Sequence, residues 1–339
     1  MIRMRIALSV IAASVLIAAA RPARAADDDF FKGRQVFVVI GFSAGGGYDL
    51  YARLLAKHMG GHLSGATLLP QNMPGAGSLK AANYIYNVAP KDGTYFGIVE
   101  QGVLFEPLFG NEGAQFDAQK FGWIGGVNSE VSTCVAWHNS PVKTFKEAFT
   151  KEMTVGGTGP GSDPYVFPRV LNAVLGTKFK LISGYPGTNE IWAGMENGEL
   201  DGLCGWYWSS ITSRKNDWLV EKKIIPMVQI GIHKHPAHPD VPLVLDYAKT
   251  ESDRQVLELT FANMAMGRPF MAPPGMPVGR LATLRRAFAD TMKDPGFLAD
   301  AAKAKLEVNP TTGEEIDALL KRLYAYPPAV VERAAQARK

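Results

Sequence analysis

Short apolar runs typical of strands alternate along the chain with segments whose apolar residues recur at helical spacing. In the first part of the chain this pattern predicts strands at 36–40, 67–71 and 95–99 and helices at 49–59 and 79–88. A second series follows Gly125-Gly126, with strands predicted at 134–137, 154–157, 179–182 and 200–204 and helices at 145–151, 165–175 and 189–197. Such alternation is typical of parallel sheets that are covered by helices.

The last third of the chain continues the pattern less regularly. Strands are predicted at 224–230 and 261–266, on either side of the proline-rich segment 235–242, and helices at 278–293 and 316–324. We therefore predict an α/β protein of two lobes with a ligand cleft between them. Lobe 1 is expected to comprise residues 26–127 and 251–339, and lobe 2 residues 128–250.

The first 25 residues have the features of a secretory signal peptide. Arg3 and Arg5 precede an apolar run at 6–20, and Ala23-Arg24-Ala25 matches a cleavage site. We expect cleavage after Ala25 and export of the mature chain. The segment holds four arginines and no acidic residue, so cleavage lowers the formal net charge from +4 to zero. A neutral chain gives no electrostatic reason to expect a nucleic acid or an anionic membrane as partner.

Three glycine-rich turns each follow a predicted strand and precede a predicted helix. They lie at 42–49, 74–78 and 156–163, and they carry the hydroxyl groups of Ser43, Ser78, Thr158 and Ser162. Glycine lets the backbone approach a ligand closely, and the start of a helix offers unpaired N–H groups and positive potential. Together the turns predict an anion site at the carboxyl ends of the strands. The alternative is that each is only a tight strand-to-helix connection.

The segment Gly41-Phe42-Ser43-Ala44-Gly45 also matches the G-x-S-x-G motif of α/β-hydrolases. A secreted serine hydrolase that uses Ser43 is therefore an alternative, with His233, His235 or His238 as the base. It is the weaker hypothesis, because a nucleophile elbow normally follows several strands and here the first predicted strand of the mature chain precedes it.

Neither a nucleotide cofactor nor a metal ion is predicted. No Gly-Lys-Ser/Thr closes any glycine loop, and Lys80 stands where the dinucleotide fingerprint that begins at Gly75 requires glycine. The histidines at 233, 235 and 238 are interrupted by prolines and have no accompanying zinc-ligand spacing. They are expected to lie in an exposed loop.

Four aromatic residues gather beside turn signals in the second series: Tyr185, Trp206, Tyr207 and Trp208. Core packing is the ordinary role of such residues, but their predicted place at the edge of the cleft makes Tyr185 and Trp206 candidate ligand contacts. Asp49 is expected to cap the helix that it opens, with a ligand contact as the alternative.

Cys134 and Cys204 each lie in an apolar predicted strand. The exported chain enters a compartment that permits disulfides. The pair is either a disulfide or two buried thiols, and the sequence leaves both open.

The chain resembles the solute-binding proteins of the tripartite tricarboxylate transporter family, also called the Bordetella uptake gene family. The resemblance rests on Phe-Ser-Ala-Gly-Gly-Gly-Tyr-Asp at 42–49, Gln-Asn-Met-Pro-Gly-Ala-Gly at 71–77 and Ala-Pro-Lys-Asp-Gly-Thr at 89–94. Further matching segments lie at 52–55, 156–162, 198–201, 239–242, 273–277 and 293–295. The family's usual Pro-Phe-x-Pro-Gly-Gly and Tyr-x-Gly motifs are altered here at 41–46 and 185–187, which leaves the identity of the ligand open.

This resemblance implies a type II periplasmic-binding-protein fold that closes on a small organic carboxylate and delivers it to integral membrane subunits of a transporter. Backbone amides and hydroxyl groups of the glycine turns hold the carboxylate in such proteins. The implied ligand-binding residues are Phe42, Ser43, Ala44, Gly45, Gly46, Tyr48, Asp49, Gly75, Ala76, Gly77, Thr158, Gly161 and Ser162. No lysine or arginine is expected to face the ligand.

The sequence thus predicts a periplasmic receptor without enzymatic activity, acting as a monomer. It needs no cofactor or metal ion. Besides the hydrolase, a sensor subunit that presents its ligand to a signalling partner remains an alternative.

Overall fold

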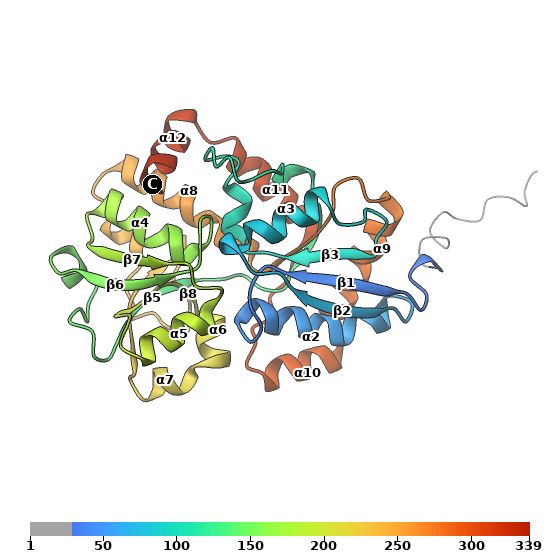
Figure 1. Cartoon of the computed structure of the whole chain (residues 1–339), viewed down its shortest axis with the longest axis horizontal. Coiled ribbons are helices and arrows are strands. Elements are labelled where there is room, and N and C mark those ends of the chain that lie inside the picture. The colour runs from blue at the N-terminus through green and yellow to red at the C-terminus, as the bar shows by residue number, and fades with distance from the viewer. Residues whose placement is uncertain (1–28) are drawn as a thin grey trace, which may run out of the picture.

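A computed structural model of the chain describes residues 29–339. The predicted signal peptide at 1–25 lies outside the described residues. Two separate sheets form, each covered by helices on both faces (Figure 1). The predicted pair of α/β units is therefore present. No helix within residues 29–339 combines the length and the apolar character that crossing a bilayer requires.

The first sheet has six strands in the order β11-β4-β10-β3-β1-β2. Its bounds are β1 (Gln35–Ile40), β2 (Thr67–Asn72), β3 (Tyr95–Ile98), β4 (Gly122–Gly126), β10 (Pro269–Ala272) and β11 (Thr311–Thr312). β1 pairs in parallel with β2 and β3, whereas β10 runs antiparallel to β3 and β4. Val38, Val39 and Ile40 of β1 point alternately to the two faces of the sheet and are all fully buried, as expected for a strand with helices on both sides.

Helices pack on both faces of this sheet (Figure 1). On one face, α2 (Gly47–His62) packs on β1 and β2 and contacts α9 (Val278–Thr291) and α10 (Pro295–Lys303). On the other face lie α3 (Leu79–Asn87), which packs on β3, and α11 (Gly313–Tyr324), which packs on β4. The turn between β1 and α2 therefore lies at the carboxyl end of a central parallel strand, where α/β folds bind ligands.

The second sheet has five strands in the order β7-β6-β8-β5-β9. Its bounds are β5 (Ser132–Trp137), β6 (Met153–Gly157), β7 (Phe179–Ser183), β8 (Gly202–Tyr207) and β9 (Ile224–Ile230). α4 (Asp163–Leu175) packs on β6, β7 and β8, and α5 (Thr188–Glu196) packs on β6. α6 (Trp208–Arg214) and α7 (Asn216–Val220) follow β8 directly.

Two late helices connect the lobes. α8 (Glu251–Phe261) and α12 (Pro328–Ala337) pack on each other and on α4 of the second lobe, while β10 and β11 join the first sheet (Figure 1). The lobe bounds at 127/128 and 250/251 stay a prediction.

Two predicted elements are wrong. Residues 261–266 are the end of α8 and a 3₁₀ turn (Ala262–Met266), and the strand begins only at Pro269. The helix predicted at 145–151 is only a 3₁₀ turn, Glu147–Phe149. Residues 261–266 are a short, mainly apolar run, whose periodicity does not separate strand from helix.

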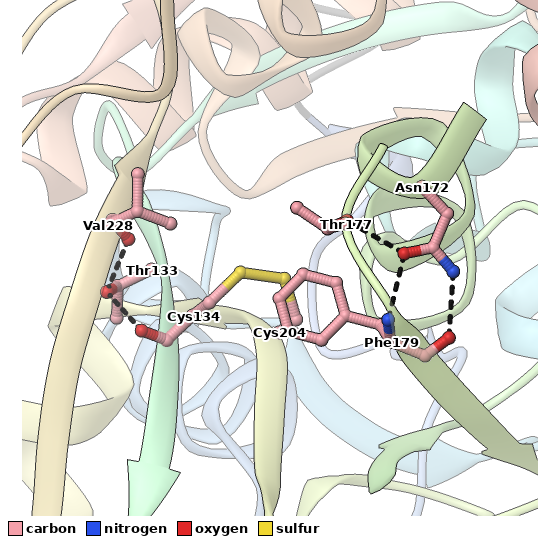
Figure 2. Close-up of a disulfide and its surroundings, with 7 residues drawn as sticks. All are labelled: Thr133, Cys134, Asn172, Thr177, Phe179, Cys204 and Val228. Carbon is pink, nitrogen blue, oxygen red and sulfur yellow. Dashed lines mark hydrogen bonds between the residues drawn. A yellow bond between two sulfur atoms is a disulfide. The ribbon is translucent and has the colours of Figure 1, made fainter. Parts of the chain in front are cut away.

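Cys134 of β5 and Cys204 of β8 lie opposite each other and form a disulfide (Figure 2). Both are fully buried, and the ring of Phe179 lies beside the bridge in the same view. Asn172 of α4 bonds both the N–H (2.9 Å) and the carbonyl (2.8 Å) of Phe179, which ties that helix to β7. The bridge therefore fixes the centre of the second sheet.

Candidate functional site

A small cavity of about 20 Å³ lies between the two lobes, close to the space that a single water requires. From the first sheet and its connections it is lined by Phe42, Gly47, Tyr48, Glu100 and Arg268. From the second it is lined by Thr158, Pro164, Thr188, Gly205, Trp206, Tyr207 and Ser210. Of the residues predicted to bind a ligand, Phe42, Tyr48, Thr158 and Trp206 lie here. The lobes are closed on each other in this structure.

The first glycine turn is held in shape by Asp49. Its Oδ2 accepts a hydrogen bond from the N–H of Gly45 (2.9 Å), and it pairs with Arg53 (2.9 Å) and Asn72 (2.9 Å). These contacts lower the pKa of Asp49 although burial opposes them. Gly46, not Asp49, is the N-cap residue of α2, so Asp49 orders the preceding loop instead of capping the helix.

The same turn docks on the start of α5 in the second lobe. Ser43 Oγ donates to Glu190 Oε2 (3.0 Å), and Asn189 Nδ2 donates to the carbonyl of Ala44 (2.8 Å). Ser43 and Ala44 therefore hold the lobes together in the closed form.

The second and third turns meet across the cleft. A Cβ atom at Gly159 would lie 2.7 Å from the N atom of Gly77, so only glycine permits this approach of the two backbones. Gly75, Ala76 and Gly77 line an open groove of about 450 Å³ together with Thr158 and Tyr185. Thr158 lines the closed cavity as well, so the two spaces are neighbours.

Two predicted hydroxyl donors are used inside their own turn. Thr158 Oγ1 donates to Ser162 Oγ (2.6 Å), which donates to the carbonyl of Gly159 (2.7 Å). Gly161 has a φ of 87° and packs against Glu106. Ser162 and Gly161 thus shape the third turn, and neither lines the cavity or the groove.

A buried chain of hydrogen bonds crosses from one lobe to the other beside the cavity. Tyr48 OH donates to Gln101 Oε1 (2.6 Å), Gln101 Nε2 donates to Tyr207 OH (2.7 Å), and Tyr207 OH donates to Asp163 Oδ2 (2.6 Å). The N–H of Asp163, at the start of α4, donates to Glu100 Oε1 (2.6 Å). A carboxyl group of the first lobe therefore occupies the N-terminus of a second-lobe helix.

Burial changes the protonation of this network. Burial and the neighbouring Asp163 raise the pKa of Glu100 well above its ordinary value, and burial raises the pKa of Asp163 to about 7. Burial also raises the pKa of Tyr48 and Tyr207. The raised pKa favours the protonated form of Glu100, which can donate a hydrogen bond.

Arg268 lines the cavity and is fully buried, which corrects the expectation that no lysine or arginine faces the ligand. It lies just before β10, far in sequence from every glycine turn. Its partner is Glu130, with Arg268 Nε 3.1 Å from Glu130 Oε1. The local pattern around Arg268 resembles no binding motif, because only the crossing of the chain between lobes brings it to the cleft.

Glu100 and Tyr207 were also not predicted to bind a ligand. Glu100 follows β3 and Tyr207 ends β8, so the rule applied to the glycine turns, that ligands lie at the carboxyl ends of strands, would have included them. Gly47, beside the predicted Gly46, also lines the cavity.

The hydrolase alternative gains no support from the geometry. Within residues 29–339, no hydrogen bond joins Ser43 to a histidine. The ring of His238 instead stacks on that of Trp208, with 3.7 Å between the ring centres, and Nε2 of His235 lies 3.2 Å from Oε1 of Glu307. In the same described range, no group of three His, Cys, Asp or Glu residues is placed to hold a metal ion.

No protein-family model matches the chain. It is 29% identical over 293 residues to a UPF0065 protein in the TAR-I ttuE-ttuC' intergenic region of Agrobacterium vitis, covering 84% of this chain and 78% of that protein. It is 25% identical over 307 residues to a UPF0065 protein in the gbd 5' region of Cupriavidus necator, covering 87% and 86% respectively.

Solved structures share the fold. The periplasmic binding protein BugD superposes with a TM-score of 0.71 at 22% identity, covering 90% of this chain and 97% of BugD. MatC from Rhodopseudomonas palustris with bound malate gives 0.70 at 21% identity, covering 88% and 99%. R. palustris Rpa4515 with adipate gives 0.69 at 17% identity, covering 89% and 97%. The predicted resemblance is confirmed: in sequence and in its two-lobed type II fold, the chain is similar to the TctC-like periplasmic binding proteins.

Proposed function

We propose that the chain is a periplasmic solute-binding protein that captures a small organic carboxylate by closing two lobes around it. The observation that carries the proposal is the cavity between the lobes. It is lined by residues of both, with the start of α2 at Gly47 and Tyr48 and a buried cation at Arg268. A helix N-terminus and a guanidinium both favour a negatively charged group. Malate and adipate in the similar structures are ligands of this class.

The proposal includes the fate of the ligand. Integral membrane subunits of a tripartite tricarboxylate-type transporter receive it, and the binding protein acts as a monomer in the periplasm after removal of residues 1–25. Exclusion of water on closure strengthens each hydrogen bond to the carboxylate, because the local dielectric constant falls. Release then requires that the membrane partner favour the open form.

A thermal-shift screen of residues 26–339 tests the binding function. The panel is acetate, L-malate, adipate, citrate and benzoate, each compared with its neutral amide. A ligand that binds only the native state raises the melting temperature with concentration. We expect at least one carboxylate, and none of the amides, to do so. A panel without any shift would contradict the proposal.

A further inference from the structure

We infer that Arg268 is the carboxylate anchor of the ligand site, placed at the back of the cleft where the chain crosses between the lobes. This inference rests on the proposed function and deepens it. It assigns one carboxylate of the ligand to a buried side-chain cation instead of to backbone amides alone.

Arg268 is positioned by a close contact between the two crossing segments. A Cβ atom at Gly267 would lie 1.3 Å from the carbonyl oxygen of Asn128, so only glycine fits there. The N–H of Glu130 donates to the carbonyl of Met264 (3.2 Å), and the N–H of Val127 donates to that of Arg268 (3.4 Å). The guanidinium is therefore carried by the connection about which the lobes close, and not by a surface loop.

The guanidinium is only partly satisfied by the protein. Nη2 donates to Ser209 Oγ (3.0 Å) and Ser210 Oγ (2.9 Å), and Nε lies 3.1 Å from Glu130 Oε1. Nε and Nη1 are both buried and have no hydrogen-bond partner among the residues that the structure describes, so the contact of Nε with Glu130 is an ion pair and not a hydrogen bond. An unsatisfied charged donor in the interior is costly. If Arg268 served only to pair with Glu130, its unpartnered N–H donors would not need to lie beside the cavity.

The residues around Arg268 keep its guanidinium charged and limit the direction from which a carboxylate can approach it. Burial opposes the charge, but Glu130 and the nearby tyrosines raise the pKa of Arg268 above its ordinary value. The Arg268 Cζ atom lies 4.6 Å from the ring centre of Tyr48, 4.7 Å from that of Tyr51 and 5.0 Å from that of Tyr207. These rings cover the faces of the guanidinium, so an incoming carboxylate must approach in the plane of the group, toward Nη1.

The nearest acid on the cavity wall does not repel such a ligand. Glu100 lines the same cavity, and its raised pKa favours the protonated, uncharged form. In that form it can donate a hydrogen bond to the ligand. The remainder of the ligand extends past Thr158, which lines both the cavity and the groove at Gly75–Gly77. The ligand is thus an acid that places one carboxylate beside Arg268 and its remaining part between the glycine turns.

The test compares variants that separate the charge of Arg268 from its structural role. Arg268→Gln alone leaves Glu130 buried without a counter-ion, which is strongly destabilising. The double variant Arg268→Gln/Glu130→Gln removes both charges, and the new amide at position 130 keeps an oxygen to accept the hydrogen bonds from Asn128 and Ser209. Glu130→Gln alone is the matched control, since it breaks the pair but retains the cation.

Binding of acetate, L-malate and adipate, and of adipamide as the neutral control, is measured by calorimetry for folded proteins. We expect the double variant to lose at least tenfold in affinity for the carboxylates that the wild type binds. Glu130→Gln should stay within threefold of the wild type or bind more tightly. Adipamide should not distinguish the three proteins.

The outcomes separate this inference from the proposed function. Equal carboxylate affinity in the double variant and in Glu130→Gln would overturn the role of Arg268 and leave the binding function intact. If both variants lose carboxylate affinity equally relative to the wild type, Arg268 acts only as the structural partner of Glu130. A wild type that binds none of the five acids of the thermal-shift panel would overturn both proposals.

Discussion

The inner end of the cleft (the floor) and its opening (the mouth) are formed by different kinds of residue. The mouth consists of glycine turns whose backbones meet at Gly77 and Gly159, and few charged groups take part. The floor consists of Arg268, Glu130, Glu100 and Asp163, all buried and joined through tyrosines. The mouth is suited to shape and closure, whereas the floor is suited to the recognition of charge.

The largest effect is expected from Gly47→Val, because Gly47 is the residue of the first glycine turn that lies against Arg268 of the floor. A Cβ atom at Gly47 would lie 2.3 Å from Ser210 Oγ and 2.9 Å from Arg268 Nη2, so a valine would separate the lobes and displace the guanidinium. We expect at least a hundredfold loss of affinity for the acid found in the screen, measured by calorimetry. Gly46→Ala is the control, because a Cβ atom there would meet only Thr188 Oγ1 at 3.8 Å; it should stay within threefold of the wild type. Similar losses in both variants would contradict this account.

A smaller effect is expected at the mouth from Gly159→Ala. The three atoms nearest to the added methyl group would be backbone atoms of Ala76 and Gly77 in the other lobe, so the main clash arises on closure and not within one lobe. We expect about a tenfold loss of affinity and an unchanged melting temperature without ligand. In small-angle X-ray scattering, ligand should reduce the radius of gyration of the variant less than it reduces that of the wild type. Compaction equal to that of the wild type would show that this contact is not required for closure.

A pH-dependent effect of about threefold is expected from Glu100→Gln. Burial in the closed structure raises the pKa of Glu100 above its ordinary 4.5, so ionisation of this carboxyl group opposes the closed form. The penalty is absent while the carboxyl is protonated in both forms, and it grows as the pH rises above 4.5. Affinity of the wild type should therefore fall between pH 5 and 8, in the range where Asp163, with a pKa of about 7, also titrates. The affinity of Glu100→Gln should fall less steeply with pH, measured by calorimetry at each pH. Identical pH profiles of affinity for the variant and the wild type would show that Glu100 does not cause the dependence.

No effect on affinity is expected from Cys134→Ala/Cys204→Ala. The disulfide closes a loop with a sequence separation of 70 and lies within the second sheet, and neither cysteine lines the cavity, although Gly205 beside Cys204 does. Its loss should reduce the free energy of unfolding by ~2–4 kcal/mol. Urea unfolding measures that change, and calorimetry should give an affinity within twofold of the wild type. A large loss of affinity would mean that the bridge also positions Trp206 or Tyr207.

The sequence predicted the mouth better than the floor because glycine turns are local signals. The turns at 42–49, 74–78 and 156–163 all connect strands to helices at the cleft, and the strand predicted at 224–230 has the bounds of β9. The roles of individual hydroxyl groups were not predictable, since Thr158 and Ser162 bond each other inside their own turn. Pattern alone cannot show which donors are already used.

The floor depends on contacts between residues that are far apart in the sequence. Arg268 meets Glu130 because the two crossing segments pass each other at Gly267 and Asn128. The segment before Arg268 was itself predicted as a strand and is a 3₁₀ turn, so its place in the cleft could not be inferred. Buried charges of this kind are defined by topology.

The most direct test of the central claim is a crystal structure of residues 26–339 with the acid identified in the screen. The account predicts that the acid lies between the lobes, with one carboxylate at the edge of the Arg268 guanidinium and beside Gly47. An acid bound outside the space between the lobes, or within it but with no carboxylate near Arg268, would contradict the account.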